Sequence, residues 1–157
     1  MKHVNNIPTM NNFQDLSKKA KYDFERFKTD GSIYSFIDCL LTLNALPDWI
    51  KNSEVENDNL NRIIDSMQHK KLIADKILTD IDDTLRFIRF YANHSKYNKS
   101  IKMEMSAAFP LEFPIRFKYI QVGELAIDSV EILKKVIDFW DDYIKDLVLK
   151  REQSELK

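Results

Sequence analysis

The stretch SIYSFIDCLLTLNALPDWI, residues 32–50, is the most apolar part of the chain and decides the fold. At helical spacing, its apolar residues cover most of a helix circumference: Ile33, Phe36, Ile37, Leu40, Leu41 and Leu43. A helix that is apolar nearly all round is usually buried, so we predict a central helix over residues 32–46. A proline ring clashes with the carbonyl four residues earlier, so this helix should end or kink before Pro47. We expect Asn44 to cap the chain break and Asp48–Trp49 to form a packed corner.

Composition predicts one globular domain over residues 1–157. Hydrophobic residues make up 44% of the chain, which is enough for a substantial core. Two glycines and four prolines leave few places to turn, which favours long helices. The formal net charge of −1 lacks the basic surplus of a DNA-coating protein, so the sequence carries no DNA-specific signal.

Three features predict a cytoplasmic protein. Residues 1–12 have no apolar segment of the kind found in secretory signals. Residues 32–50 are interrupted by Asp38, Thr42, Asn44 and Pro47, so they are too short and too polar to span a membrane. The single cysteine, Cys39, excludes an intrachain disulfide and reads as a small buried apolar residue.

Helical patterns flank the central stretch. A first helix is predicted from Asn12, with Asp15 three residues later, to a stop at Gly31. A third is predicted from near Asn59, and it either breaks near residues 68–71 or runs on into a fourth helix over residues 71 to about 94. The last helix should open at the capping pair Asp128 and Glu131. Its apolar stripe is Leu133, Val136, Ile137, Trp140, Tyr143, Ile144 and Leu147. Residues 1–10 and 150–157 are expected to be loosely ordered.

Between the fourth and last helices the apolar period changes to two, which indicates strands. Residues 101–105 alternate, and so do residues 115–122, where Ile115, Phe117 and Tyr119 are expected to face inward and Arg116 and Lys118 outward. Gly123–Glu124 can turn the chain into residues 125–127 to make a hairpin. The predicted fold class is therefore α+β, mainly α: a bundle of about five helices with a small antiparallel hairpin sheet before the last one.

The stretch closest to a chemical motif is RFIRFYANHSKY, residues 86–97. Spacings of three, four and three place Arg86, Arg89, Asn93 and Lys96 in one row, a candidate partner-binding or phosphate-binding surface. His94 lies on the opposite side with Phe87, Phe90 and Tyr91, which form a second apolar face and a candidate interface. Arg86 has Asp82 four residues earlier as a surface partner. Arg89 has no acidic residue three or four positions away, so its partner must lie elsewhere in the fold, in another chain or in a ligand.

The arginine–histidine pair resembles the loose motif of the HEPN superfamily, helical bundles that include RNA-cleaving toxins and defence proteins. The resemblance covers this motif and the helical layout of residues 10–97. It implies that Arg89 binds phosphate and that His94 acts as acid and base in a metal-independent ribonuclease, often with both subunits of a dimer contributing. In such motifs a polar residue usually follows the arginine, and here Phe90 stands there.

A second resemblance extends over most of the chain. Asp48–Trp49, then Arg89, Asn93 and Lys96–Tyr97, and finally Phe139–Trp140, are similar to a group of small uncharacterised bacterial proteins with an N-x-x-K-H-like signature. Tyr97 occupies the position of the histidine. This resemblance implies no known activity.

The alternative to catalysis is structural, since cations and asparagine are common at helix C-termini. The three histidines are scattered without metal-ligand spacing, and no Gly-rich phosphate loop is present, so we expect no metal and no cofactor. The leading functional hypothesis is a non-catalytic, self-associating interaction module of a bacterial cytoplasmic complex. The alternative is a HEPN-like RNA-binding or RNA-cleaving protein of a toxin or anti-phage defence system.

Overall fold

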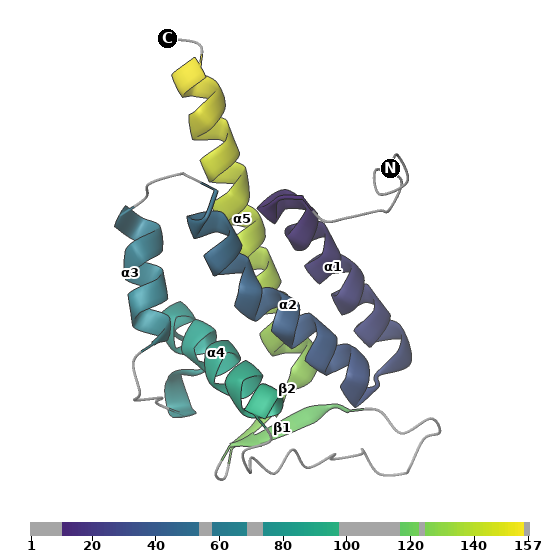
Figure 1. The fold of residues 1–157 in the computed structure, drawn as a ribbon. Coiled ribbons are helices and arrows are strands. Elements are labelled where there is room, and N and C mark those ends of the chain that lie inside the picture. The colour runs from purple at the N-terminus through teal and green to yellow at the C-terminus, as the bar shows by residue number, and fades with distance from the viewer. Residues whose placement is uncertain (1–10, 54–57, 69–73, 98–116, 123–124, 156–157) are drawn as a thin grey trace.

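The computed structural model describes residues 11–53, 58–68, 74–97, 117–122 and 125–155, except for the side chains of residues 74 and 94–97. Within these ranges the chain forms five α-helices, one 3₁₀ turn and one two-stranded antiparallel sheet that precedes the last helix (Figure 1). In order they are α1 (Phe13–Asp30), α2 (Ile33–Lys51), α3 (Asp58–Met67), η2 (Ala74–Lys76), α4 (Ile81–Tyr97), β1 (Tyr119–Val122), β2 (Leu125–Asp128) and α5 (Ser129–Glu155). The predicted fold class is confirmed.

Local capping defines the antiparallel pair α1 and α2. The Asn12 side chain accepts the Asp15 backbone N–H at 2.9 Å, and Gly31 ends α1 in the left-handed region at φ 62°. Its N–H donates to the Phe27 carbonyl at 2.7 Å, an arrangement that glycine adopts without a steric penalty. Ser32 then caps α2 by accepting the Ser35 N–H. The predicted start and stop of the first helix are confirmed.

Helix α2 lies centrally, as predicted, and contacts α1, α3, α4 and α5. Its predicted end before Pro47 is wrong, because the helix continues through Pro47 to Lys51. Proline removes one backbone hydrogen bond, but Leu46, Pro47 and Ile50 are all buried, and this packing holds the last turn in place. Asn44 therefore caps no chain break.

The predicted fourth helix begins later than expected, since α4 starts at Ile81. The Asp80 carboxylate accepts the Asp82 N–H at 2.9 Å and so forms an N-terminal cap. The Thr84 hydroxyl bonds back to the Ile77 carbonyl, and the Lys135 ammonium donates to the Leu78 carbonyl from α5. These bonds hold residues 77–80 as a turn outside the helix. Ile77 is nevertheless fully buried, as expected for an apolar residue of the predicted helix face.

The predicted hairpin is confirmed, with Tyr119 opposite Asp128 and Val122 opposite Leu125. The expected alternation fails at Tyr119, which is 37% exposed, whereas Ile120 is buried. The ladder begins only at Tyr119, because the Phe117 N–H donates instead to the Gly31 carbonyl at 2.7 Å. The Phe117 ring packs against Phe36 with centroids 4.8 Å apart. Residues 101–105, together with Ile115 and Arg116, lie outside the described residues.

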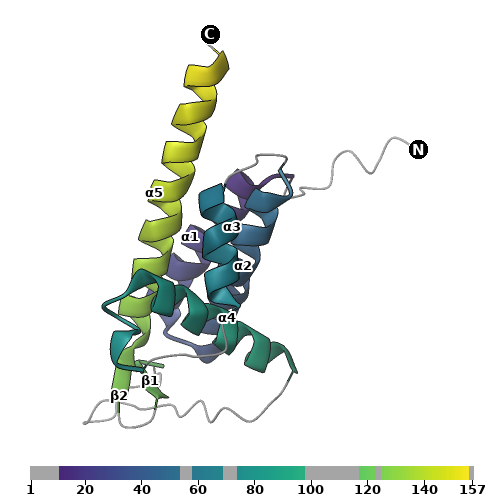
Figure 2. The same ribbon diagram turned by 90° about the vertical axis from the view of Figure 1, so that its left-hand side faces the viewer.

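Helix α5 opens as predicted, with the Asp128 carboxylate accepting the Glu131 N–H at 2.9 Å. Most of its predicted apolar stripe is buried, including Trp140 at 1% exposure, while Tyr143 is partly buried. The Lys21 ammonium on α1 binds Asp141 on α5, and this bond, with a second from Lys145, lowers the pKa of Asp141. The helix then projects past the bundle to Glu155, so residues 150–155 are helical, with exposed side chains, where we expected loose order (Figure 2).

Candidate functional site

The predicted basic row lies along α4, where this helix packs on α2 and α3. The side chains of Arg86 and Arg89 are each 18% exposed, so both are largely covered. Asn93 is exposed, and the Lys96 side chain lies outside the described residues. Arg86 was expected to pair with Asp82, but its ion pair is with the buried Asp83, at 3.3 Å.

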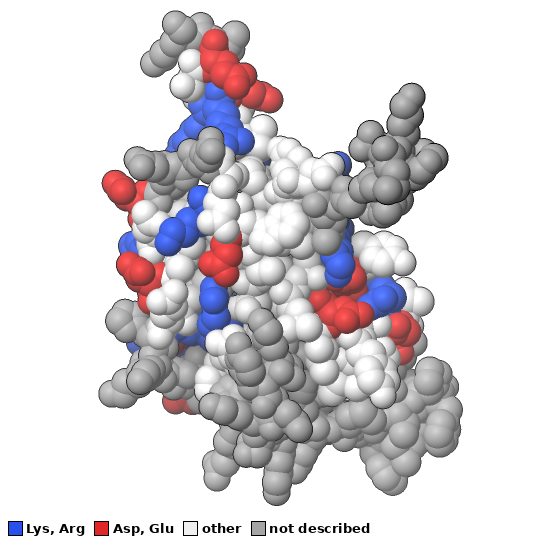
Figure 3. All heavy atoms as spheres, viewed as in Figure 1, with Lys and Arg blue, Asp and Glu red and all other residues white. Residues whose placement is uncertain are grey.

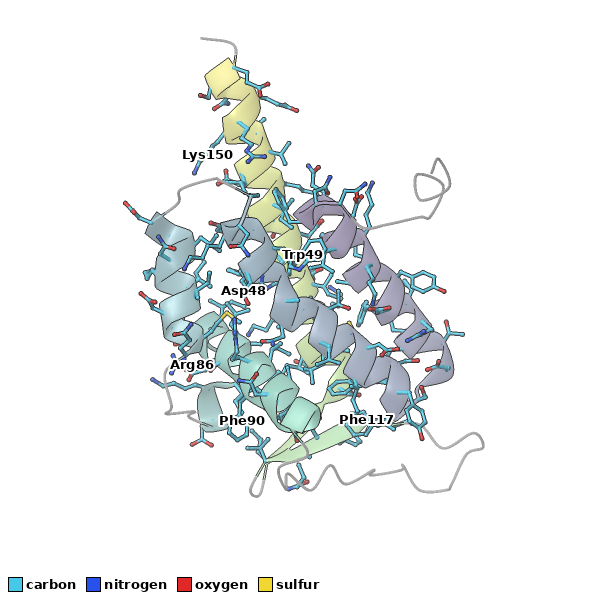
Figure 4. All side chains as sticks on the ribbon, viewed as in Figure 1. Asp48, Trp49, Arg86, Phe90, Phe117 and Lys150 are labelled. Carbon is cyan, nitrogen blue, oxygen red and sulfur yellow. The ribbon has the colours of Figure 1, made fainter. Side chains whose placement is uncertain are left out.

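The partner of Arg89 lies on another helix. Its Nη2 is 3.8 Å from Oδ2 of Asp48, which lies within the continuous helix α2 and not at the packed corner that residues 48–49 were expected to form. Figure 4 shows Asp48 on α2 and Arg86 on α4 on the side of the bundle where these helices meet. Since the Asp48 side chain is 52% exposed, this is a long, solvent-screened ion pair.

Several buried polar atoms at this contact are unsatisfied. Among the described residues, neither Nε nor Nη2 of Arg89 has a hydrogen-bond partner, and Oδ1 of Asn44, one turn before Asp48, has none either. Two arginines and two aspartates balance the formal charge of the cluster. Arg89 therefore retains donor capacity, but the nearby carboxylates reduce the attraction for an added anion.

The proposed catalytic pair occupies one continuous helix. Helix α4 runs through His94 to Tyr97, and five residues on an α-helix turn through about 140°, so positions 89 and 94 face different directions. The His94 side chain lies outside the described residues. The catalytic roles that the HEPN resemblance implies for Arg89 and His94 therefore stay predictions.

The candidate interface of Phe87, Phe90 and Tyr91 is wrong in two of its three residues. Phe87 and Tyr91 are 0% and 2% exposed, with ring centroids 4.6 Å apart, because α2, α3 and α5 all contact α4. Burial raises the pKa of Tyr91 to about 12, so its hydroxyl stays protonated at neutral pH. Phe90 is 42% exposed, and its contact with a partner stays a prediction.

The sequence pattern did not reveal a second surface, on the outer side of α2. We call it the α2 outer strip: Tyr34, Leu41, Ala45 and Trp49, which follow one another at spacings of seven, four and four residues. Tyr34 is 79% exposed and Leu41 38%, while Ala45 and Trp49 are partly buried. The available signal was the all-round apolar character of residues 32–50, which exceeds what the described part of the chain covers.

Charged residues lie in and beside the α2 outer strip. Asp38, four residues after Tyr34 and three before Leu41, lies on the same face and binds Arg26 of α1. Asp48 pairs with Arg89 of α4 at the edge of the strip. Figure 3 shows few charged atoms over the middle of α2 and charged groups on either side of it. Intrachain pairing of these aspartates offsets their charge along the strip.

Other candidate chemistry is limited within the described part of the chain. No group of three or more histidine, cysteine, aspartate or glutamate side chains is placed to hold a metal ion there. Cys39 is buried, its thiol lies 3.7 Å from the Ala20 carbonyl, and burial raises its pKa, which disfavours the reactive thiolate. None of the helices in the described ranges has the length and apolar character needed to cross a bilayer.

Comparison with models of known families, with curated proteins and with solved structures found no match. Both resemblances stated above therefore stay predictions.

Proposed function

We propose that this chain is a non-catalytic interaction module that self-associates through the α2 outer strip. The observation that carries the proposal is an exposed apolar row, including Tyr34 and Leu41, on the helix at the centre of the fold. Contiguous exposed apolar surface usually marks an interface. Membership of a bacterial cytoplasmic complex, as predicted from the sequence, would use the same surface.

A second copy of the chain suits this strip better than a charged partner. The carboxylate on this face, Asp38, is already paired with Arg26 of the same chain, and the cores of interfaces are depleted of charge and enriched in aromatic residues. Leu41 lies close to the midpoint between Tyr34 and Trp49. An antiparallel pair of α2 helices around a two-fold axis would therefore set each Tyr34 near the partner copy's Trp49 region, with the two Leu41 side chains at the centre.

The test is the mass in solution. Sedimentation equilibrium should give about twice the chain mass of 18.6 kDa for the natural protein, and 18.6 kDa for Leu41→Glu, because a buried charge would stand at the centre of the interface. Tyr22→Glu is the matched control: Tyr22 is 67% exposed on α1, outside the strip, so this variant should remain dimeric. A natural chain that stays at 18.6 kDa at every concentration would contradict the proposal.

The second candidate is a HEPN-like RNA-binding or RNA-cleaving protein. The observation that favours it is the unsatisfied Nε and Nη2 of Arg89. A phosphate oxygen would supply the acceptor that these buried donors lack. Ribonuclease activity in the presence of a chelator, lost in both Arg89→Ala and His94→Ala proteins that melt normally, would establish this function in place of the first.

A further inference from the structure

A pocket of about 310 Å³ lies at the end of the α1–α2 pair, where α1 begins and α2 ends. It is separate from the Arg89 cluster and adjoins the α2 outer strip only at Trp49. The residues that line it are Asn11, Asn12, Phe13, Trp49, Asn52 and Ser53. Figure 4 shows Trp49 at this end of α2.

The lining is uncharged and rich in hydrogen-bonding groups. Asn12 and Asn52 offer amide groups, each of which carries donors and an acceptor in one plane, and Ser53 adds a hydroxyl. Two aromatic rings complete the wall. The start of α1 and the end of α2 bring helix ends of opposite partial charge to the same pocket, so their electrostatic potentials partly cancel there. A neutral ligand is favoured over an ion.

The hydrogen bonds already present leave specific groups available. Oδ1 of Asn12 is occupied by the Asp15 N–H, so the Asn12 amide nitrogen is the part left for a ligand. Asn52 is held by its backbone, whose N–H donates to the Asp48 carbonyl at 3.0 Å, so its side chain has no part in ending the helix. The Ser53 hydroxyl donates to the Ile50 carbonyl at 2.6 Å and keeps lone pairs that can accept.

We propose that this pocket binds a neutral nucleobase, stacked on Trp49 and hydrogen-bonded by the asparagine amides. A base has a flat π-face that stacks on aromatic side chains, and its edge carries adjacent donors and acceptors. Adenine is the best match, because an asparagine amide can pair with its N6 and N7 together. None of the six lining residues is a cation, so the recognition proposed here is of the base. Arg151 of α5 borders the pocket, since it donates to the Ser53 carbonyl at 3.3 Å and lies 5.9 Å from the Phe13 ring centroid.

Calorimetric titration of the full chain with adenosine tests the assignment. We expect saturable binding that Trp49→Leu and Asn52→Ala each weaken about tenfold or more, since each removes one mode of recognition. Asn61→Ala is the matched control: it removes an exposed asparagine from α3 and should leave the affinity unchanged. The Asn52 side chain is exposed, so its loss should not unfold the protein, and a thermal melt of each variant verifies this.

Trp49 also belongs to the α2 outer strip, so the titration is repeated with Leu41→Glu as background. Unchanged adenosine affinity in that monomeric variant is the expected result and separates base binding from self-association. Three results would overturn the assignment: absence of saturable binding, an affinity unaffected by Asn52→Ala and Trp49→Leu, or tighter binding of glucose than of adenosine.

Discussion

The two long sides of α2 differ in how completely their charged and polar groups are hydrogen-bonded. Toward α1, Lys19 Nζ is 2.6 Å from Asp23 Oδ2, and the Thr42 hydroxyl donates to the same oxygen at 2.8 Å. Toward α4, Arg89 stands 3.8 Å from Asp48 and leaves two nitrogens without a hydrogen bond among the described residues. The first contact is short and satisfied, and the second is long and incomplete.

Burial explains why the contrast matters. Asp23 is 2% exposed, so its carboxylate depends on Lys19 and Thr42 in place of water. Asp48 is 52% exposed and keeps its hydration whether or not Arg89 is near. The α1–α2 contact is therefore fixed by a polar network, whereas α4 is held mainly by apolar burial of Phe87, Ile88 and Tyr91. A ligand or partner that exchanges polar contacts would act on the α4 side at the lowest cost.

The largest expected loss of stability comes from a residue whose burial supports both the α1–α2 contact and the α2–α4 contact. Trp140 is 1% exposed on α5, which packs against α1, α2 and α4. Trp140→Ala should lower the free energy of unfolding by about 3–5 kcal/mol, measured by urea denaturation, because it opens a cavity in the shared core. Trp140→Phe should cost much less, since it keeps most of the volume and removes an indole N–H that has no partner among the described residues. A loss under about 1 kcal/mol for the alanine variant would mean that α5 does not support both contacts.

The next effect should be confined to the α1–α2 contact. Asp23→Ala should lower the free energy of unfolding by about 1–3 kcal/mol, because Thr42 and Lys19 lose a buried acceptor. The cost stays below that of an isolated buried charge, since the Lys19 side chain is 39% exposed and can reach water. Asp38→Ala is the matched control on the α1 side of α2. Because Asp38 is 50% exposed, its loss should lower the free energy of unfolding by only about 0–1 kcal/mol. Equal losses in the two variants would remove the distinction between satisfied and exposed polar contacts.

Local signals predicted the ends of helices and the hairpin. The capping residues act on backbone groups no more than four residues away, so the local sequence predicts their roles. They are Asn12, Gly31 and Asp128. Pro47 shows the limit of such reading. The rule that proline ends a helix was overridden by burial around Pro47 and Ile50, which depends on what α2 packs against.

Features that depend on distant parts of the chain were missed. The Arg89–Asp48 pair joins two helices, so the sequence could indicate only that Arg89 needs a partner elsewhere. Phe87 and Tyr91 looked like an interface because periodicity records apolar character and not which neighbour covers it. The same limit hid the α2 outer strip, where the apolar residues lack a cover within the described part of the chain. Nothing in the sequence placed Asn12 beside Asn52 in one pocket.

The smallest effect is expected for the Arg89–Asp48 pair. If the partner of Arg89 were a buried carboxylate, removing Arg89 would cost about 3–5 kcal/mol. Because Asp48 is half exposed at 3.8 Å, a double-mutant cycle of Arg89→Ala and Asp48→Ala should give a coupling energy below 1 kcal/mol, about 0.2–1, falling further in high salt. The control cycle, Lys19→Ala with Asp23→Ala, should give a larger coupling that salt changes less, since one partner is buried. A coupling above about 2 kcal/mol for Arg89 and Asp48 would show that the two groups close into a direct, desolvated bond in solution, and the contrast between the two sides of α2 would then disappear.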